Sequence, residues 1–231
     1  MNRAGRFRPV AAVSALVAGA AGLAANAFLV GYYVLARPWQ PGHDGPWEWL
    51  GSANDLVGAL ASAATIPVVG YLVRRVPGDR LLGGFGVAAV LGSAAMAAAG
   101  PMLVAGAITL QTQFVVAGVA LPVLFGWLWR ASVAARRHGV LPRRTARLGE
   151  LIGAIALGAT TVAGVGALLP AGSTAQYVLV GVAAVPGLLA YLAYPAWQLL
   201  AGRAWWRGEP ARWSADQSRV VGGVSPGLAR E

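Results

Sequence analysis

The 18 basic residues of this 231-residue chain are all arginines, and all but one lie in alternate gaps between long apolar stretches. The exception, Arg37, shares its gap with Asp44, Glu48 and Asp55. Connections on the cytoplasmic side of a membrane carry an excess of arginine and lysine. The pattern therefore predicts an all-α membrane helix bundle with six transmembrane helices and both termini in the cytoplasm.

Composition leads to the same fold class. Hydrophobic residues make up 57% of the chain and charged residues 11%, whereas about a quarter of the residues of a soluble domain are charged. The net charge of +10 does not indicate nucleic acid, because the arginines form short clusters beside apolar runs. Membrane lipids are the expected partners. The absence of cysteine excludes disulfides and thiolate chemistry.

Six stretches are apolar over the length that a helix needs to cross the hydrocarbon core, or close to it. Backbone in lipid must satisfy its own hydrogen bonds, so these stretches are expected to be helices. Residues 1–202 should form the transmembrane domain, and residues 203–231 should form a disordered cytoplasmic tail. The predicted spans are 10–36, 53–73, 81–99, 102–129, 148–169 and 175–201.

The arginines in the gaps after the second and fourth spans set the direction of the chain. By the positive-inside rule these gaps face the cytoplasm, and their guanidinium groups contact anionic lipid headgroups. The gaps at 37–52, at Gly100-Pro101 and at 170–174 then face outward. The arginines to which we assign this role are Arg74, Arg75, Arg136, Arg137, Arg143, Arg144 and Arg147.

Local patterns predict where two helices begin. Ser52, three residues before Asp55, and Ser173, three residues before Gln176, are typical of capping boxes. Asp55 would then lie in a first helical turn and complement the helix dipole. Glu150 lies three residues from Arg147, and we expect these two to form an ion pair.

The first span has an alternative interpretation. Its flanking arginines, its apolar core and Ala25-Asn26-Ala27 resemble a cleavable signal peptide. The apolar run continues through residues 28–35, which is too long for an ordinary signal core, so retention as a membrane helix is the preferred interpretation.

A few polar residues are candidates for binding a ligand. Asp55 could form a polar pocket near the outer surface with Asn54 and Asn26. Thr65, Gln111 and Gln113 are expected near the middle of their spans, where they would either hydrogen-bond between helices or line a small-molecule cavity. Gln111 and Gln113 are two residues apart on a helix, so at most one of them should face a given cavity.

Small residues recur four apart, a spacing that lets helix backbones approach closely within a bundle or in a homo-oligomer. The pairs are Ala11 with Ala15, Ala18 with Gly22, Gly149 with Gly153, and Ala154 with Gly158.

No catalytic, cofactor or metal site is predicted. The two histidines, His43 and His138, fall in gaps on opposite sides of the membrane, so neither can activate Ser93 as a nucleophile. His43 with Asp44 and Glu48 could form a metal site, but interfacial anchoring of this tryptophan-rich loop is preferred. The acidic candidates Asp55 and Glu150 should lie at opposite ends of the bilayer, which is unsuited to paired acid–base work.

Two segments carry a family resemblance: 53–60, ANDLVGAL, and 140–149, VLPRRTARLG. They resemble the recurring pieces of a family of small six-helix integral membrane proteins of actinobacteria whose function is unknown. The resemblance implies the same six-helix topology in a bacterial plasma membrane, and it supplies no catalytic residues.

The preferred functional hypothesis is a non-enzymatic membrane protein with a structural or regulatory role, or one that binds a lipid or another small ligand. A membrane-protein partner is compatible with either role. The alternative is a transporter or permease subunit for a small uncharged or amphipathic substrate, with kinks at Pro67 and Pro186 opening a cavity. Because no carboxylate is expected at the midplane, proton-driven transport is disfavoured.

Overall fold

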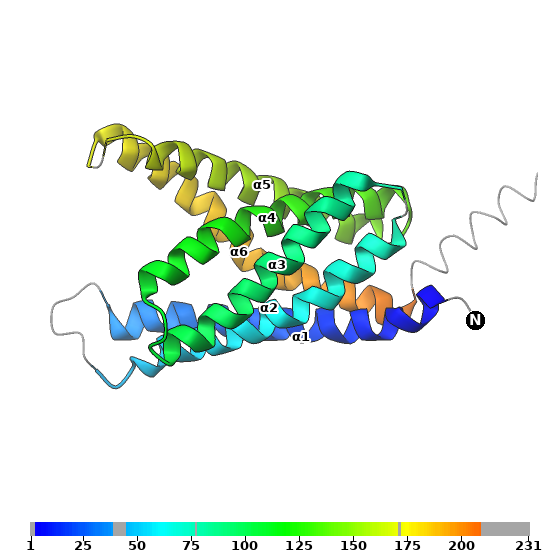
Figure 1. Ribbon diagram of the computed structural model, residues 1–231, viewed down its shortest axis with the longest axis horizontal. Coiled ribbons are helices and arrows are strands. Elements are labelled where there is room, and N and C mark those ends of the chain that lie inside the picture. Colours follow the sequence, from blue (N-terminus) through cyan, green and yellow to red (C-terminus); the bar gives the residue numbers. More distant parts are fainter. Residues whose placement is uncertain (1–2, 39–44, 77, 171, 209–231) are drawn as a thin grey trace, which may run out of the picture.

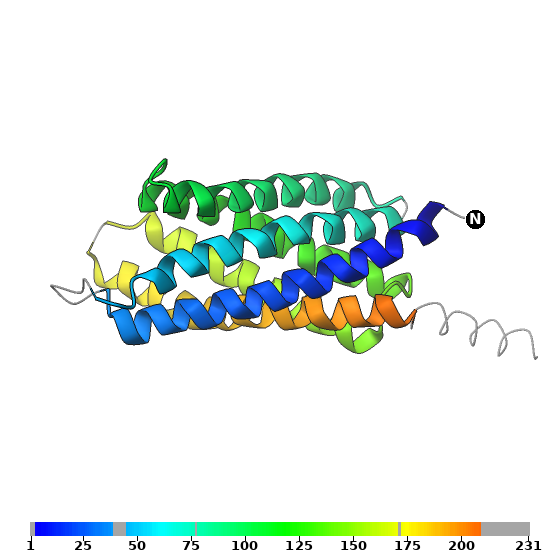
Figure 2. The same ribbon diagram turned by 90° about the horizontal axis from the view of Figure 1, so that it is seen from below.

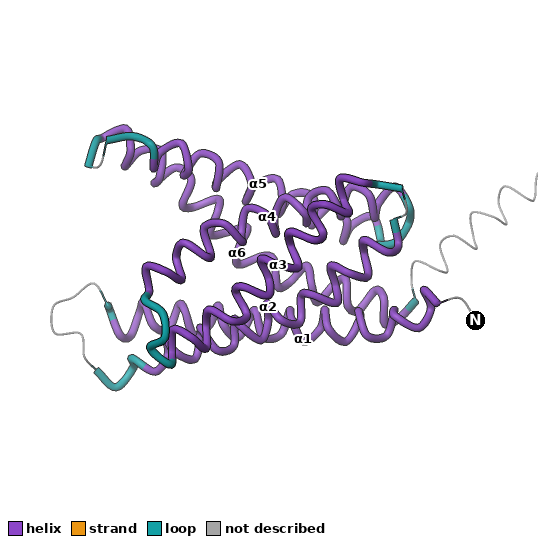
Figure 3. The backbone as a smooth tube through the Cα atoms, in the orientation of Figure 1, coloured by secondary structure: helices purple, strands orange, loops and turns teal. Residues whose placement is uncertain are grey.

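A computed structural model describes residues 3–38, 45–76, 78–170 and 172–208. The described residues form helices joined by short connections, with no strand among them (Figure 3). This confirms the all-α fold class. The helices are α1 (Arg3–Gly31), the π-helix η1 (Tyr32–Ala36), α2 (Trp49–Arg75), α3 (Arg80–Val104), α4 (Leu110–Arg137), α5 (Arg143–Ala167) and α6 (Thr174–Arg207).

The helices form a ring, and each packs against its neighbours in sequence (Figures 1 and 2). The C-terminal half of α6 packs along α1. At the other end of the bundle the start of α6 lies apart from the end of α1 (Figure 1). The start of α1 and the end of α6 lie at one end of the bundle, together with the α2–α3 and α4–α5 connections. We call this the arginine-rich end, because those two connections and the helix ends beside them carry the predicted arginines. The other three connections lie at the opposite end.

All six α-helices in the described residues are long and apolar enough to cross a membrane. Large apolar side chains face outward, with Leu168 87%, Val119 66% and Leu81 65% exposed. Isolated exposed apolar residues are ordinary on a soluble protein, but exposure along every helix indicates a hydrocarbon surrounding. The length and composition of the six helices confirm the prediction of a multi-pass membrane protein.

The expected connection at Gly100-Pro101 was wrong, since both residues lie inside α3. A Cβ atom at Gly100 would collide with the main-chain oxygen of Asp55, so glycine here serves a close α2–α3 contact rather than a turn. The chain turns further on, at Gly106 with its positive φ of 71°. The α4 helix then starts after Thr109, whose hydroxyl accepts a hydrogen bond from the Thr112 amide at 3.2 Å.

The two predicted helix starts had different outcomes. Ser173 does cap α6, accepting a hydrogen bond from the Gln176 amide at 3.2 Å. Ser52 caps nothing, because α2 begins earlier, at Trp49. Packing of Trp49 against Phe28 of α1, with ring centroids 6.0 Å apart, accompanies this extra turn. Asp55 is therefore more than one turn inside α2 and not in its first turn.

The C-terminal boundary of the bundle also differs from the prediction. Helix α6 continues through Arg207, so residues 203–207 belong to the helix and not to a tail. Trp205 within this extension is 1% exposed, and its indole nitrogen donates to the Val140 carbonyl oxygen at 3.2 Å. The rest of the predicted tail, like His43 and Asp44, lies outside the described residues.

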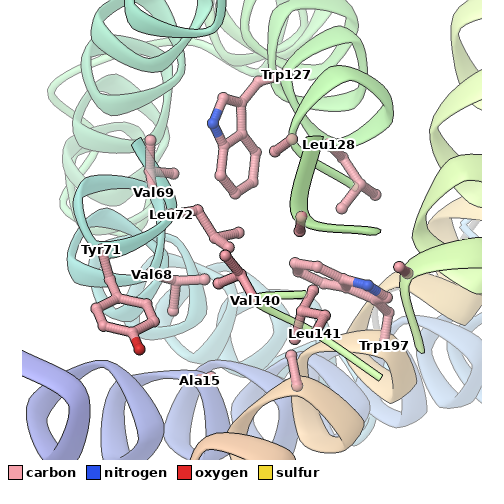
Figure 4. Close-up of a cluster of buried hydrophobic side chains, with 14 of the residues drawn as sticks. Ala15, Val68, Val69, Tyr71, Leu72, Trp127, Leu128, Val140, Leu141 and Trp197 are labelled. Carbon is pink, nitrogen blue, oxygen red and sulfur yellow. The ribbon is translucent and has the colours of Figure 1, made fainter. Parts of the chain in front are cut away.

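The hydrophobic core occupies the arginine-rich half of the bundle. Its largest members, Trp127, Trp197 and Trp205, are fully buried there, and Leu72 packs with them. Val140 and Leu141 from the α4–α5 connection are 5% and 3% exposed and point in among them (Figure 4). The tip of a connection thus fills the centre of the ring at this end. The segment 140–149, which carries part of the family resemblance in the sequence, thus places its first two residues inside the bundle.

Two ion pairs join elements at the arginine-rich end. The expected Glu150–Arg147 pair was wrong: Glu150 Oε1 instead accepts from Nε of Arg136 on α4 at 2.6 Å, which ties α4 to α5. Arg136 is therefore not purely a lipid-facing arginine. Arg130 pairs with Asp79 at 2.7 Å. The Leu82 amide, which donates to Asp79 at the start of α3, and then Arg130 hold the pKa of that carboxyl below its usual range.

The predicted small-residue contacts hold for three of the four pairs. Ala11, Ala15 and Ala18 of α1 are at most 2% exposed, and a Cβ atom on Gly22 would lie 2.7 Å from the Pro195 ring of α6. Gly149 and Gly153 of α5 are equally tight against α4 and α6. By contrast, a Cβ atom on Gly158 would meet nothing within 4 Å. The Ala154–Gly158 pair makes no close contact of this kind, and the homo-oligomer stays a prediction.

Gly153 and Gly158 form a matched test of this packing. A Cβ atom at position 153 would lie 2.6 Å from the Trp129 main-chain nitrogen, and backbone cannot easily move aside. We expect Gly153→Ala to destabilise the bundle by about 1–3 kcal/mol through overpacking. Gly158→Ala should be neutral or stabilise by up to about 1 kcal/mol through helix propensity. Reversible unfolding in mixed micelles would measure both, and equal effects would contradict the packing described here.

Candidate functional site

A cavity of about 580 Å³ lies inside the ring, in the half away from the arginine-rich end. Residues of α1, η1, α2, α3, α4 and α6 line it, whereas α5 contributes none of the lining residues in the described chain. Leu110 and Phe114 of α4 line it while being 54% and 64% exposed, so the cavity reaches the outside of the bundle there. Its size is within the range of small-molecule sites.

The structure brings five of the six sequence-predicted ligand residues to this one cavity: Asn26, Asn54, Asp55, Thr65 and Gln113. Gln111 is exposed and does not line it, in agreement with the expectation that only one of the two glutamines faces a cavity. The expected mid-span position of these glutamines was wrong, because α4 begins at Leu110 and both lie in its first turn. Ligand binding by the five residues stays a prediction.

Asp55 is the centre of the polar wall near the cavity mouth. Gln113 Nε2 of α4 donates to Asp55 Oδ1 at 3.0 Å, and Asn54 Nδ2 donates to the same oxygen at 3.4 Å. The Gln113 bond joins two helices that otherwise make few contacts with each other. Gln113 therefore makes an interhelical hydrogen bond and lines the cavity at once, so the two alternatives stated for it from the sequence occur together.

A second polar group forms the floor of the cavity. Gln198 Nε2 of α6 donates to Thr65 Oγ1 at 2.8 Å and to the Tyr194 hydroxyl at 3.1 Å. Thr65 Oγ1 in turn donates to the Ala61 carbonyl oxygen at 2.9 Å, so its one donor is used. Gln198 is only 1% exposed. This group separates the cavity from the tryptophan-rich core.

Two further cavity-lining side chains lack any partner in the described chain. Asn26 is 8% exposed and its Nδ2 makes no hydrogen bond. Ser93 of α3 is 4% exposed and its Oγ makes none either. A buried polar group without a partner is destabilising by about 1–3 kcal/mol. Both atoms are shielded from the cavity by neighbouring protein atoms, so they lie within its wall and not on its surface.

Sequence reasoning missed several residues of this wall. Glu48 lines the cavity but was considered only as a loop residue, and Gln198 and Tyr194 were not considered as site residues. The spacing of seven between Glu48 and Asp55 is a helical repeat and could have placed them on one face. It was hidden because the helix start was assigned to Ser52. The π-helix η1, which puts Tyr32 and Tyr33 on the cavity, has no clear sequence signal.

A smaller groove of about 390 Å³ lies between α4, α5 and α6. Leu121, Phe125 and Tyr191 line both spaces, so the groove and the cavity share a wall. Apart from Thr160 and Tyr191, the side chains that line the groove are apolar. The Thr160 hydroxyl donates to carbonyl oxygens of its own helix and offers no free donor.

The residues that the sequence offered for catalysis or metal binding are not brought together among the described residues. Within the described segments no three His, Asp or Glu residues come together as a metal site would require. Ser93 lies on the cavity, while His138 ends α4 at the arginine-rich end. Glu150 is also at that end, at the start of α5, far along the bundle from Asp55.

Comparison with protein-family models, with curated proteins and with solved structures finds no match for this chain. The resemblance to the actinobacterial six-helix family therefore stays a prediction. The function has to be argued from the site itself.

The floor of the cavity can be tested through stability. Gln198→Leu removes the amide that donates to both the Thr65 hydroxyl and the Tyr194 hydroxyl, two groups on side chains that are 2% and 8% exposed. We expect a loss of about 1–3 kcal/mol in unfolding free energy. The control is Gln111→Leu, at an exposed position outside the cavity, which should change stability by less than about 0.5 kcal/mol. Similar losses for both variants would argue against a structural role of the floor.

Proposed function

We propose that this protein is a non-enzymatic membrane protein that binds a small lipid-like or amphipathic ligand in the cavity near Asp55. The observation that carries the proposal is a largely apolar cavity with a cluster of polar side chains, Asp55, Gln113 and Asn54, near its mouth. A ligand with polar groups near one end would contact that cluster. Its apolar part would cover the remaining wall.

A purely structural role accounts less well for this cavity. Membrane helices associate through close packing, and the arginine-rich half of the bundle has such packing. If the other half had the same task, small changes such as a larger residue at Gly58 would fill the space. A Cβ atom at that position would meet only the Ala25 methyl group, at 4.0 Å. The unfilled space beside Gly58 therefore supports a bound ligand.

An enzymatic role has less support. Nucleophilic catalysis by Ser93 would need a base within hydrogen-bond reach, and Ser93 Oγ has no partner among the described residues. General acid–base catalysis with Asp55 and Glu150 would need them in one site, and they belong to opposite ends of the bundle. These positions favour a binding protein that needs no cofactor.

We assign the arginine-rich end to the cytoplasm, with the cavity in the outer half of a bacterial plasma membrane. The support is the charge asymmetry: connections at one end carry arginine clusters, and those at the other carry Arg37 alone among basic residues. Arg74 packs over the Phe7 ring at 4.6 Å and Arg75 over the Tyr71 ring at 5.8 Å. Such arginines can reach lipid headgroups while their stems cover apolar surface.

Reporter fusions test this orientation. A cytoplasm-active reporter at Gly139, in the α4–α5 connection, should be active, and an export-dependent reporter there should be inactive. Fusions at Gly106, in the α3–α4 connection, should give the reverse. The reason is that arginine-rich connections are retained on the cytoplasmic side. The opposite pattern at both positions would invert the assignment.

A transporter or permease subunit is the second candidate, favoured by one observation. The polar lining runs from Asp55 near the mouth to Gln198 at the floor, and the packed core lies beyond it. This is the form that a substrate site closed on one side would take. Pro67 and Pro186 lie within α2 and α6, where helices can bend. Substrate accumulation in vesicles that contain the protein would favour this candidate over binding alone.

Filling the cavity tests the binding proposal. Gly58→Leu places a branched side chain on the cavity wall, whereas Gly118→Leu places the same side chain where a Cβ atom meets nothing within 4 Å and no cavity is lined. Both variants should fold. After gentle extraction, native mass spectrometry should detect a bound small molecule on the wild type and on Gly118→Leu, and should lose it on Gly58→Leu.

The same measurement can overturn the proposal. Equal occupancy of the wild type and Gly58→Leu would place the bound molecule elsewhere, and a wild type that carries no small molecule in a native-lipid extract would leave the cavity without an occupant. Monodisperse elution of both variants is the control for folding.

A further inference from the structure

The charges on the cavity wall are all of one sign. Glu48 and Asp55 line it, and no arginine or histidine is among the lining residues in the described chain. Arg37, near the same end, is exposed and donates to the Val34 carbonyl oxygen at 3.5 Å rather than to either carboxylate. The two acidic side chains thus face a common space without a basic partner in it.

We infer that the ligand of this cavity is an organic cation, an ammonium group carried on an apolar body. This inference rests on the proposed binding function and specifies the chemistry of the ligand. Two sources could supply such an ammonium group: a free amphipathic amine, or the amine headgroup of an aminolipid.

Asp55 has the geometry to receive such a group. Both of its amide hydrogen bonds, from Gln113 and Asn54, go to Oδ1. Oδ2 has no partner in the described chain and remains available to a donor from the ligand. A hydrogen bond between an ammonium and a carboxylate is among the stronger ones in proteins, particularly where water is largely excluded.

Glu48 and its neighbours extend the cation-binding site toward the mouth of the cavity. Glu48 Oε1 is shielded by neighbouring protein atoms, and the Tyr32 hydroxyl lies beside this carboxylate. Tyr32 and Tyr33 line the same stretch, with ring centroids 5.8 Å apart and planes at 71°. Aromatic rings attract cations over their faces. The local chemistry of the mouth is therefore carboxylate and aromatic, as ammonium recognition requires.

Other ligand classes fit less well. A carboxylate or phosphate group would meet two like charges with no arginine to pair with. A bare inorganic cation would need several oxygen ligands in a compact cage, whereas much of this cavity is lined by leucine, alanine and phenylalanine. The unpartnered atoms Asn26 Nδ2 and Ser93 Oγ are shielded within the wall and could not complete a shell with Asp55 around an ion.

The test compares three probes of equal chain length, namely octylammonium, octanol and octanoate. Their affinities would be measured for the full chain in nanodiscs of phosphatidylglycerol, a lipid without an amine. Octylammonium should bind about tenfold or more tightly than octanol, because a charge-assisted hydrogen bond contributes at least that factor. Octanoate should bind more weakly than octanol.

Variants then locate the effect. Asp55→Asn keeps the size of the side chain and removes its charge, and it should abolish the preference for octylammonium. Asp55→Glu should retain the preference. The control is Asp79→Asn, which removes one negative charge outside the cavity while asparagine can still cap α3. It should bind all three probes as the wild type does.

Several outcomes would overturn the inference. A ratio of octylammonium to octanol affinity nearer to one than to ten would do so, as would an unchanged ratio in Asp55→Asn or a matching loss in Asp79→Asn. Gly58→Leu separates this failure from failure of the binding function. Suppose that the wild type binds octylammonium and octanol equally and that Gly58→Leu binds neither: the cavity then binds ligands without selecting cations. If Gly58→Leu instead binds both probes as the wild type does, the cavity is not the binding site.

A second lipid mixture distinguishes the two sources of the amine. Adding phosphatidylethanolamine to the nanodiscs should weaken apparent octylammonium binding if the aminolipid headgroup enters the cavity. Unchanged octylammonium binding assigns the cavity to a free amine.

Discussion

The bundle depends on close contact between helices, because helices in lipid gain nothing from withdrawing apolar side chains from one hydrocarbon into another. The α1–α6 contact shows how this is met. Gly19 and Gly22 of α1 lie against Pro195, and Gly202 of α6 lies against the Ala12 main chain, so a Cβ atom at any of the three would come within 3 Å of its neighbour. This contact joins the first and last helices and closes the ring that encloses the cavity.

The two halves of the bundle are packed to different densities, and the cavity lies in the less densely packed half. In the arginine-rich half, tryptophans and the inserted Val140 and Leu141 fill the centre of the ring. In the other half the cavity occupies the space between the helices. There the elements are joined by hydrogen bonds such as Gln113 to Asp55 and Gln198 to Thr65. Polar contacts are directional and leave gaps between them, so this half holds helices together while retaining room for a ligand.

How far the sequence predicted the site depended on local spacing. Asn26, Asn54, Asp55, Thr65 and Gln113 were singled out because polar residues in a membrane helix need a partner, and the structure gathers all five around one cavity. Glu48 was missed because Ser52 resembles a helix cap. The partner of Glu150 was misassigned because Arg147 is close in sequence, whereas Arg136 is close only after α4 packs on α5.

The sequence by itself determined that there are six helices, where most of their apolar cores lie and which ends carry arginine. These properties follow from helix length and from the positions of charge, and both are local along the chain. Tertiary structure decided the rest. Gly100 was taken for a turn until its contact with the Asp55 main chain showed that it lies inside a helix. Likewise, the cavity exists only because six helices form a ring whose two halves are packed differently, and no segment alone carries that information.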